Sequence, residues 1–350
     1  MAEFTVWISD GAGTPGARTG SMQVVTLGWS QEINAHDQIT VTTPAFGGHP
    51  DIGGIEPGRS LIWVLSDGVP ITVGWVTAAQ IDVPGETVMW TAVGPMAYFD
   101  RRLIKVAVTQ TAADVLDVAR SLITVAQAKP SGSIGLGLDT ATAGVTRDLE
   151  ILVSDHEKVG EVYARIAEED GFDWRVTPRW VGDTLTATLE HEHPAGGQAT
   201  GRPIVHGTQI DITSADWDGT ALATSIVATG AGSGDTTPTA TATIDPAAGL
   251  LTEDVISATG VVDTGVLGQV AARVAARTAT APVRLTGVLR PHPDVSATQP
   301  ATGEIVDLTA DLGPIQIAND RYRVVAKTVV IDQTGTGLTT LELTEAARFV

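Results

Sequence analysis

The chain has 350 residues, which is more than one ordinary hydrophobic core organises, so we expect two to four domains. It contains no cysteine, and this excludes disulfides, thiolate chemistry and cysteine-based metal sites. Its 21 Lys and Arg residues against 41 Asp and Glu residues give a formal net charge of -20, which disfavours specific binding to the phosphates of nucleic acids.

The N-terminal region is expected to start a β domain. It lacks the basic and then apolar segments of a signal peptide, and no stretch of the chain approaches the roughly 18 uninterrupted apolar residues of a membrane span. Phe4–Asp10 and Met22–Gly28 read as two strands. The loop Gly11–Gly16 matches the dinucleotide fingerprint G-x-G-x-x-G, which requires a following helix. Another strand follows here, so we interpret the loop as part of a hairpin.

The stretch Gly58–Ile104 organises the first domain. A further alternating run, Gln38–Pro44, and a loop rich in glycine and proline precede it. Within the stretch, β-branched and aromatic residues recur in runs of about five to seven, and turn formers interrupt them at Ser66–Gly68 and Pro84–Gly85. This pattern predicts three or four short antiparallel strands that form a meander.

A weaker copy of the meander is expected near the C-terminus. Gly303–Leu308 aligns with Gly58–Trp63, and Arg321–Gly335 aligns with Gly74–Gly85 through a shared Ile-Asp-x-x-Gly sequence. The fold class that follows is mainly β with an α/β insertion. It comprises two related β-barrel or sandwich domains and smaller α/β domains.

Three helices are predicted between the two meanders. Apolar residues recur at helical spacing over residues 111–130, which begin with a capping-box-like sequence at Thr111. A second helix is expected to start at the cap Ser154, with Glu157 as its reciprocal partner, and to stop at Gly171. Val266 to Thr278 mark the third helix.

The remaining alternating segments predict strands at Leu149–Val153, Phe172–Val176, Thr184–Glu190, Gln209–Thr213, Ala223–Thr229 and Val283–Leu289. From these elements we divide the chain into four parts. They are a first β-barrel domain at 1–104, a small α/β domain at 105–200, a second β-barrel domain formed by 201–240 and 300–350, and an α/β segment inserted at 241–299.

Candidate metal ligands occur at the end of one predicted strand. His191 and His193 stand two residues apart, so both imidazoles would lie on one face, and His206 follows. Three such ligands could bind a divalent metal. The alternative is a solvated strand end before Pro194, and we favour it. We therefore predict no metal site, no catalytic residues and no cofactor.

A paired-carboxylate site is a second possibility. Asp211, Asp216 and Asp218 surround Trp217, and sugar hydrolysis uses two carboxyl groups across a cleft. Sequence spacing does not supply that geometry, so we interpret these aspartates as solvated loop residues.

Tryptophans are concentrated in the first β domain. They lie alongside the other residues of the predicted strands, which favours packing in a core or at a subunit interface over a platform for glycans. Two arginines follow the meander, and they could pair with the surplus acids of another subunit or form a solvated strand start. Our candidate interface residues are Trp29, Trp63, Trp75, Trp90, Arg101 and Arg102.

The chain resembles a family on the following residues: Trp29 with Ile33–Asn34, Ile55–Gly58, Gly94–Arg102, the capped helix at Thr111, Gly171–Trp174, and Leu222–Val227 running into Gly230–Gly234. These resemble the central tail-tip (baseplate) hub proteins of long-tailed bacteriophages, particularly the minor tail proteins of actinobacterial phages. The resemblance covers most of the chain. It implies a homotrimer whose two β-barrels per subunit make six, matching a sixfold tail tube above and a threefold fibre or spike below.

The resemblance also implies partners and a location. The partners are a distal tail or tail tube protein, a central fibre or spike protein and the tape-measure protein, and the place is the virion tail tip after synthesis in the host cytoplasm. Because the chain stops at Val350, just after the second barrel, we expect no appended peptidase or fibre domain and no enzymatic activity. Two alternatives stay open: a protein that binds a host cell-wall glycan, and a metal-dependent hydrolase.

Overall fold

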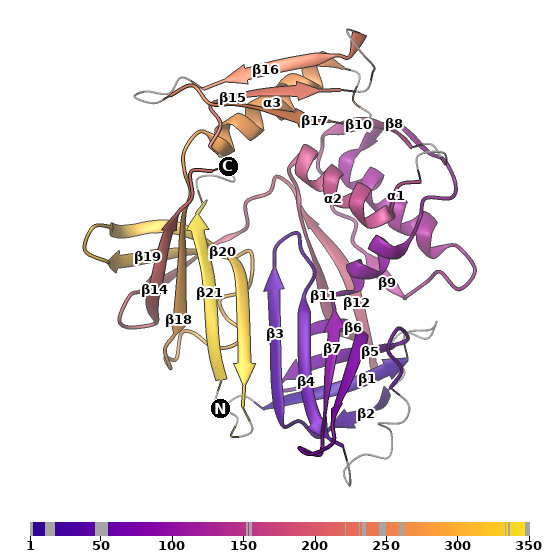
Figure 1. Ribbon diagram of the computed structural model, residues 1–350, viewed down its shortest axis with the longest axis vertical. Coiled ribbons are helices and arrows are strands. Elements are labelled where there is room, and N and C mark those ends of the chain that lie inside the picture. The colour runs from indigo at the N-terminus through magenta and orange to yellow at the C-terminus, as the bar shows by residue number, and fades with distance from the viewer. Residues whose placement is uncertain are drawn as a thin grey trace.

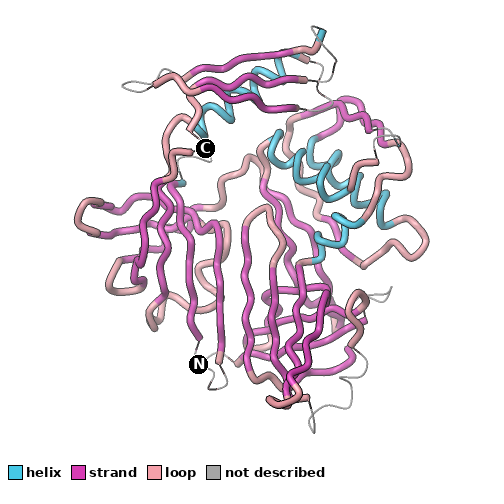
Figure 2. The backbone as a smooth tube through the Cα atoms, viewed as in Figure 1, coloured by secondary structure: helices cyan, strands magenta, loops and turns pink. Residues whose placement is uncertain are grey.

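The computed structural model describes residues 3–346 except 11–17, 46–54, 152, 154–155, 221, 231, 233–235, 245–249, 259–260, 262, 333 and 335–336. The predicted hairpin loop Gly11–Gly16 and part of Gly230–Gly234 lie outside the described residues. Two β units lie side by side, and two smaller units with helices lie beyond one end of them (Figure 1). Strands predominate, and the helices are confined to the smaller units and their borders (Figure 2).

The first β unit comprises β1 (Phe4–Asp10), β2 (Arg18–Met22), β3 (Thr26–Glu32), β4 (Gln38–Pro44), β5 (Ser60–Ser66), β6 (Val69–Asp82) and β7 (Thr87–Val93), followed by the 3-10 helix η2 (Pro95–Arg101). Its strands pair antiparallel in the order β3-β4-β7-β6-β5-β1-β2. The predicted meander is confirmed as β5, β6 and β7. Alternate residues of β5 face two different cores, because Trp63 packs with the helices and Ile62 packs inside the β unit.

The second β unit comprises β13 (Ala199–Val205), β14 (Ile210–Trp217), β18 (Val283–Leu289), β19 (Ile305–Asp311), β20 (Gln316–Ile331) and β21 (Gly337–Glu345). Here β14, β18, β21, β20 and β19 pair antiparallel in that order, and β13 adds parallel to β19. Because β20 also pairs with β3, the described strands of both units form one 13-stranded sheet whose order runs as an open path from β14 to β2.

The two β units are related copies, as the sequence predicts. Strands β3 to β7 and strands β14, β18, β19, β20 and β21 follow the same chain order and make the same pairings. A bulge follows Val76 in β6 and Val324 in β20. Gly58 and Gly303 both have positive φ, and their N–H groups donate to Val76 O at 2.7 Å and Val324 O at 2.8 Å.

The alignment of the copies differs from the predicted one by two residues. The Ile-Asp-x-x-Gly match pairs Ile81 with Ile331, whereas the shared bulge makes Val329 the equivalent of Ile81. The turn between β20 and β21 is longer than the turn between β6 and β7, which shifts the short sequence match relative to the strands. The first strand also differs, because β1 pairs antiparallel with β5 while β13 pairs parallel with β19.

The helical unit comprises β8 (Val108–Asp114), α1 (Val115–Gln127), β9 (Leu136–Leu138), β10 (Thr146–Ile151), α2 (Val159–Asp170), β11 (Asp173–Val181) and β12 (Thr184–Glu192). The predicted hairpin is confirmed as β11 and β12, which pair antiparallel. Buried residues of α1 and α2 share one core with β5, so this unit packs directly on the first β unit.

Both predicted helix starts in this unit are wrong. Residues up to Asp114 continue β8, and the Asp114 carboxylate caps α1 by accepting from the Leu116 N–H at 3.0 Å. The second helix starts at Val159 and not at Ser154, which lies outside the described residues. Glu157 instead accepts from Arg165 Nη1 at 2.6 Å. The stop at Gly171 is confirmed, with φ of 68°.

The inserted segment comprises β15 (Ser225–Thr229), β16 (Thr239–Thr243), β17 (Glu253–Ser257) and α3 (Thr264–Thr278), which share a small core. Helix α3 confirms the third predicted helix. The strand pairing divides this region differently from the predicted boundaries at 241 and 299. Strand β15 pairs within the insert, and β18 pairs with β14 and β21 of the second β unit. The predicted boundaries differ because the residue pattern of a strand does not reveal its pairing partners.

Candidate functional site

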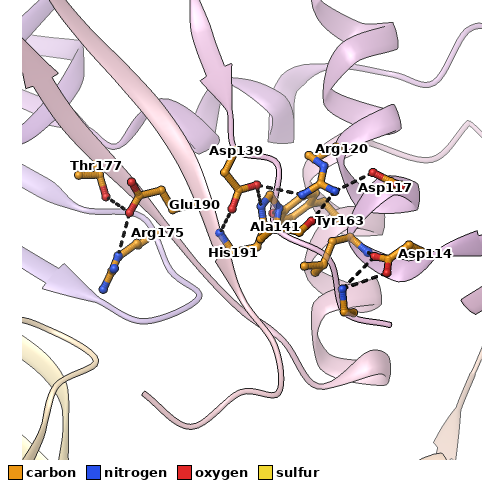
Figure 3. A network of polar contacts seen from close by, with 12 residues as sticks. Asp114, Asp117, Arg120, Asp139, Ala141, Tyr163, Arg175, Thr177, Glu190 and His191 are labelled. Atoms are coloured by element: carbon orange, nitrogen blue, oxygen red, sulfur yellow. Dashed lines mark hydrogen bonds and ion pairs between the residues drawn. The ribbon is translucent and has the colours of Figure 1, made fainter. Parts of the chain in front are cut away.

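His191 belongs to a buried polar network (Figure 3). Its Nδ1 lies 2.7 Å from Asp139 Oδ1, its Nε2 lies 2.6 Å from Tyr163 Oη, and Arg120 Nη1 donates to the same Asp139 oxygen at 2.9 Å. The His191 side chain is fully buried, and burial lowers its pKa although Asp139 opposes this. The strand end at His191 was predicted to be solvated, and this prediction is wrong because the side chain is packed inside the protein. The network joins α1, α2 and β12.

The candidate metal ligands are not brought together. Both ring nitrogens of His191 are engaged in the network, and His206 Nδ1 accepts from the Ile212 N–H at 3.0 Å. Over the part of the chain that the structure describes, no group of three or more His, Asp or Glu side chains could hold a metal ion.

The three aspartates around Trp217 each have a local partner. Asp211 Oδ2 accepts from Arg290 Nε at 2.7 Å, Asp216 Oδ2 accepts from Ser214 Oγ at 3.3 Å, and Asp218 Oδ1 accepts from the Thr220 N–H at 2.9 Å. The loop interpretation is wrong for Asp211 and Asp216, which lie in β14, and only Asp218 follows the strand. Asp216 and Asp218 are exposed, and Asp211 is half-buried.

Three of the candidate interface residues lie in cores. Trp29, Trp63 and Trp90 are each less than 5% exposed. The indole N–H of Trp63 donates to Ser9 Oγ at 2.8 Å, and that of Trp90 donates to Thr43 Oγ1 at 3.1 Å. The core alternative therefore describes these three rings, and neither a glycan nor another subunit can stack on them.

The other three candidates form a cluster at the edge of the first β unit. Trp75 and Tyr98 pack edge to face with centroids 5.8 Å apart, and the Arg101 guanidinium lies 5.4 Å from the Trp75 centroid. Arg102 donates to Tyr98 Oη and to Ala126 O. Arg101 is exposed. Its interface role and that of Trp75 and Arg102 stay predictions.

A buried ion pair joins the helical unit to the second β unit. Arg323 of β20 donates to Asp173 Oδ2 at the start of β11, and both side chains are at most 7% exposed. Asn34, which follows β3, donates to Asp173 Oδ1 at 2.9 Å and accepts from the Trp174 N–H at 2.8 Å. Segments far apart in the sequence therefore meet at Asp173.

Beside this junction lies a cavity of about 290 Å³ whose lining includes two further charged residues, the half-buried Asp37 and the buried Lys327. Asp37 accepts from Thr72 Oγ1 at 2.7 Å and from Gln31 Nε2 at 3.3 Å. Burial raises the pKa of Asp37 to about 6. Burial likewise lowers the pKa of Lys327 to about 8. Both shifts oppose the charged form, so these groups pack at a cost to stability.

We expect Asp37→Asn to change how stability depends on pH. An acid whose pKa is raised from 3.8 to about 6 in the folded chain binds its proton more tightly when folded, so ionisation destabilises the fold as pH rises through that window. Relative to the parent, the variant should gain about 2 kcal/mol of unfolding free energy between about pH 4 and pH 7. Urea unfolding across that range measures the difference. A difference between the two proteins that is independent of pH would contradict the prediction.

Two exposed strand edges were missed by the sequence analysis. The first comprises the end of β6 and the turn after it, where Ile81 is 64% and Val83 69% exposed. The end strand of the described sheet, β14, exposes Trp217 by 57%. The sequence shows large apolar residues at the tips of these strands. Their exposure could not be predicted, because it becomes apparent only when the strand register identifies the buried counterparts in the other copy.

Comparison with protein-family models finds no match, and comparison with curated protein sequences finds none either. Among solved structures, the tail protein from Neisseria meningitidis MC58 is similar at 15% identity and a TM-score of 0.64, with 98% of this chain and 96% of that chain covered. The prophage MuSo2 43 kDa tail protein from Shewanella oneidensis is similar at 12% identity and a TM-score of 0.65, with 99% of each chain covered.

A third similar structure is the E. coli c3393 protein. It is described as a component of the type VI secretion system with structural similarity to the T4 bacteriophage tail proteins gp27 and gp5. It matches at 9% identity and a TM-score of 0.52, covering 96% of this chain and 76% of that chain. The whole described chain, both β units and the smaller units included, therefore has the fold of phage tail proteins.

Proposed function

We propose that the chain is a non-enzymatic structural protein of a phage-type virion, a trimeric hub at the tail tip like the minor tail proteins of actinobacterial phages. The internal repeat carries this proposal. Two β units with the same strand order and pairing let three copies present six similar surfaces to a sixfold tube, while the trimer keeps threefold symmetry for a fibre or spike.

The partners follow from the two symmetries. On one side the ring would contact a distal tail or tail tube protein, and on the other a central fibre or spike protein. DNA and the tape-measure protein would pass through its channel. The described similarity of c3393 to the T4 bacteriophage tail proteins gp27 and gp5 supports a place among the proteins of a phage-type tail. The formal net charge of -20 supports a lumen that repels DNA. Among the described helices, none is long and apolar enough to cross a membrane.

The oligomeric state tests this proposal. We expect sedimentation of the purified chain, and symmetry-resolved images of assembled tails, to show three copies around one axis. A chain that stays monomeric both at high concentration and inside assembled tails would overturn the hub. The rival glycan-binding function predicts saturable quenching of tryptophan fluorescence by host cell-wall glycans, and the hub predicts no quenching.

A further inference from the structure

The two β units of one chain are joined by direct strand pairing. Residues Ala326–Ile331 of β20 pair antiparallel with Leu27–Glu32 of β3, so that Val329 lies opposite Trp29. Val329 and Ile331 belong to the second β unit by sequence, yet both are buried in the core of the first. Each thus leaves its own unit to complete the core of its neighbour.

The same edge exists in the first copy without a partner. The shared bulge makes Val76 of β6 the equivalent of Val324 of β20. Counting along both strands from this point, Ile81 is the equivalent of Val329. In the same way, Val83 is the equivalent of Ile331. Strand β5 covers β6 only as far as Trp75, and no described strand pairs with the same edge beyond it. All residues from Thr77 to Val83 are exposed.

The complementary edge is β14. It pairs with β18 as β3 pairs with β4, and it is the end strand of the described sheet. Through these pairings Ala215 of β14 is the equivalent of Trp29, and Asp216 is the equivalent of Ser30. Ala215 is half-buried and packs at the border of the second core.

We infer that β14 of one copy pairs antiparallel with residues 78–83 of β6 and its turn in the next copy. In the register of the intrachain joint, Gln80 lies opposite Asp216, and Ile81 lies opposite Ala215. Ile81 and Val83 then enter the second core of the neighbouring copy, and Ala79 covers Trp217. This inference rests on the proposed trimer, because it supplies the contact between its subunits.

The pairing also accounts for the two exposed edges. An uncovered strand edge with apolar residues is a site of unwanted association, and natural proteins cover it. The two edges differ, because β14 is the end strand of the described sheet whereas β6 lies between β7 and β5, so the contact is head to tail and closes a ring when the rotation per copy is one third of a turn. Asp216 is also flanked by Arg284 of β18, which limits repulsion by nearby Asp82.

The first test replaces the inserted side chains. Ile81→Asp with Val83→Asp should convert a trimer into monomers in sedimentation at concentrations where the parent chain is fully trimeric, with the melting temperature of the monomer unchanged. Val69→Asp is the matched control, because Val69 begins the same strand and is also 64% exposed. Trimers that persist in the double variant would overturn the inference.

The second test uses the absence of natural cysteines. A chain carrying Gln80→Cys and Asp216→Cys should form disulfides between chains on mild oxidation and give ladders that end at three chains under denaturing conditions. The equivalent pair Ser30→Cys and Thr328→Cys lies across the intrachain joint and should close within one chain, which calibrates the reaction at this register.

The outcomes separate the two proposals. A particle of three chains in which the intrachain pair closes and the Gln80/Asp216 pair does not would overturn this contact and leave the trimeric hub intact. A monomer without interchain disulfides at every concentration and in assembled tails would overturn both. Ladders that continue past three chains would support the strand pairing and contradict the trimer.

Discussion

Replacing Arg323 with alanine is expected to destabilise the folded chain by about 3–5 kcal/mol. Its guanidinium is buried and pairs with Asp173, so the variant leaves a buried carboxylate without its counter-charge. Asp173 also holds Asn34, and loss of its position should loosen the contact between the helical unit and both β units. Equilibrium unfolding in urea measures the change.

The control for this prediction lies two residues away on the same strand. Arg321→Ala removes an exposed guanidinium and should change the unfolding free energy by less than about 0.5 kcal/mol. The double variant Arg323→Met with Asp173→Asn removes both charges together and should cost less than the sum of the single changes, because no lone buried charge remains. Strict additivity would show that the two groups do not interact.

Trp29→Ala should be as damaging, at about 3–5 kcal/mol. The ring is 2% exposed, packs against Phe4 at 5.6 Å between centroids and lies opposite Val329 on β20. Its loss therefore opens a cavity at the joint between the two β units. We expect a lower melting temperature and faster proteolysis of both units.

Val330→Ala is the control for Trp29→Ala, because it truncates an apolar side chain at the same joint but outside the core. Val330 stands next to Val329 on β20 but faces outward and is 51% exposed, so its truncation should cost less than about 0.5 kcal/mol. An equal loss from Trp29→Ala and Val330→Ala would contradict the placement of the joint's core.

The candidate site illustrates which parts of this molecule local sequence can predict. Runs of β-branched and aromatic residues between turn formers predicted the meander strands, because such side chains favour strands and glycine and proline favour reversal of the chain. The tryptophans were identified as packing residues for the same reason. The exposed edges at Ile81 and Trp217 were not recognised, since an apolar residue on a strand has the same local pattern whether its neighbour belongs to the same chain, to another copy or is absent.

Local errors had a similar cause. Thr111 and Ser154 satisfy the chemistry of a helix cap, yet α1 begins after Asp114 and α2 after Lys158. In the first case residues 108–114 gain more from pairing with β10 than from a further helical turn. Gly171 was predicted correctly, because a left-handed residue at a helix end depends on the glycine itself and not on distant partners.

By itself, the sequence determined the mainly β class, the two related meanders, the third helix and the acidic character of the surface, since each depends on residue type and short-range spacing. Only the tertiary structure decided that β20 crosses to β3, that Arg323 meets Asp173 across 150 residues, and that Ile81 corresponds to Val329. These features depend on strand register and on contacts between distant segments. Such contacts are selected by the packing of whole units, which no single stretch of sequence encodes.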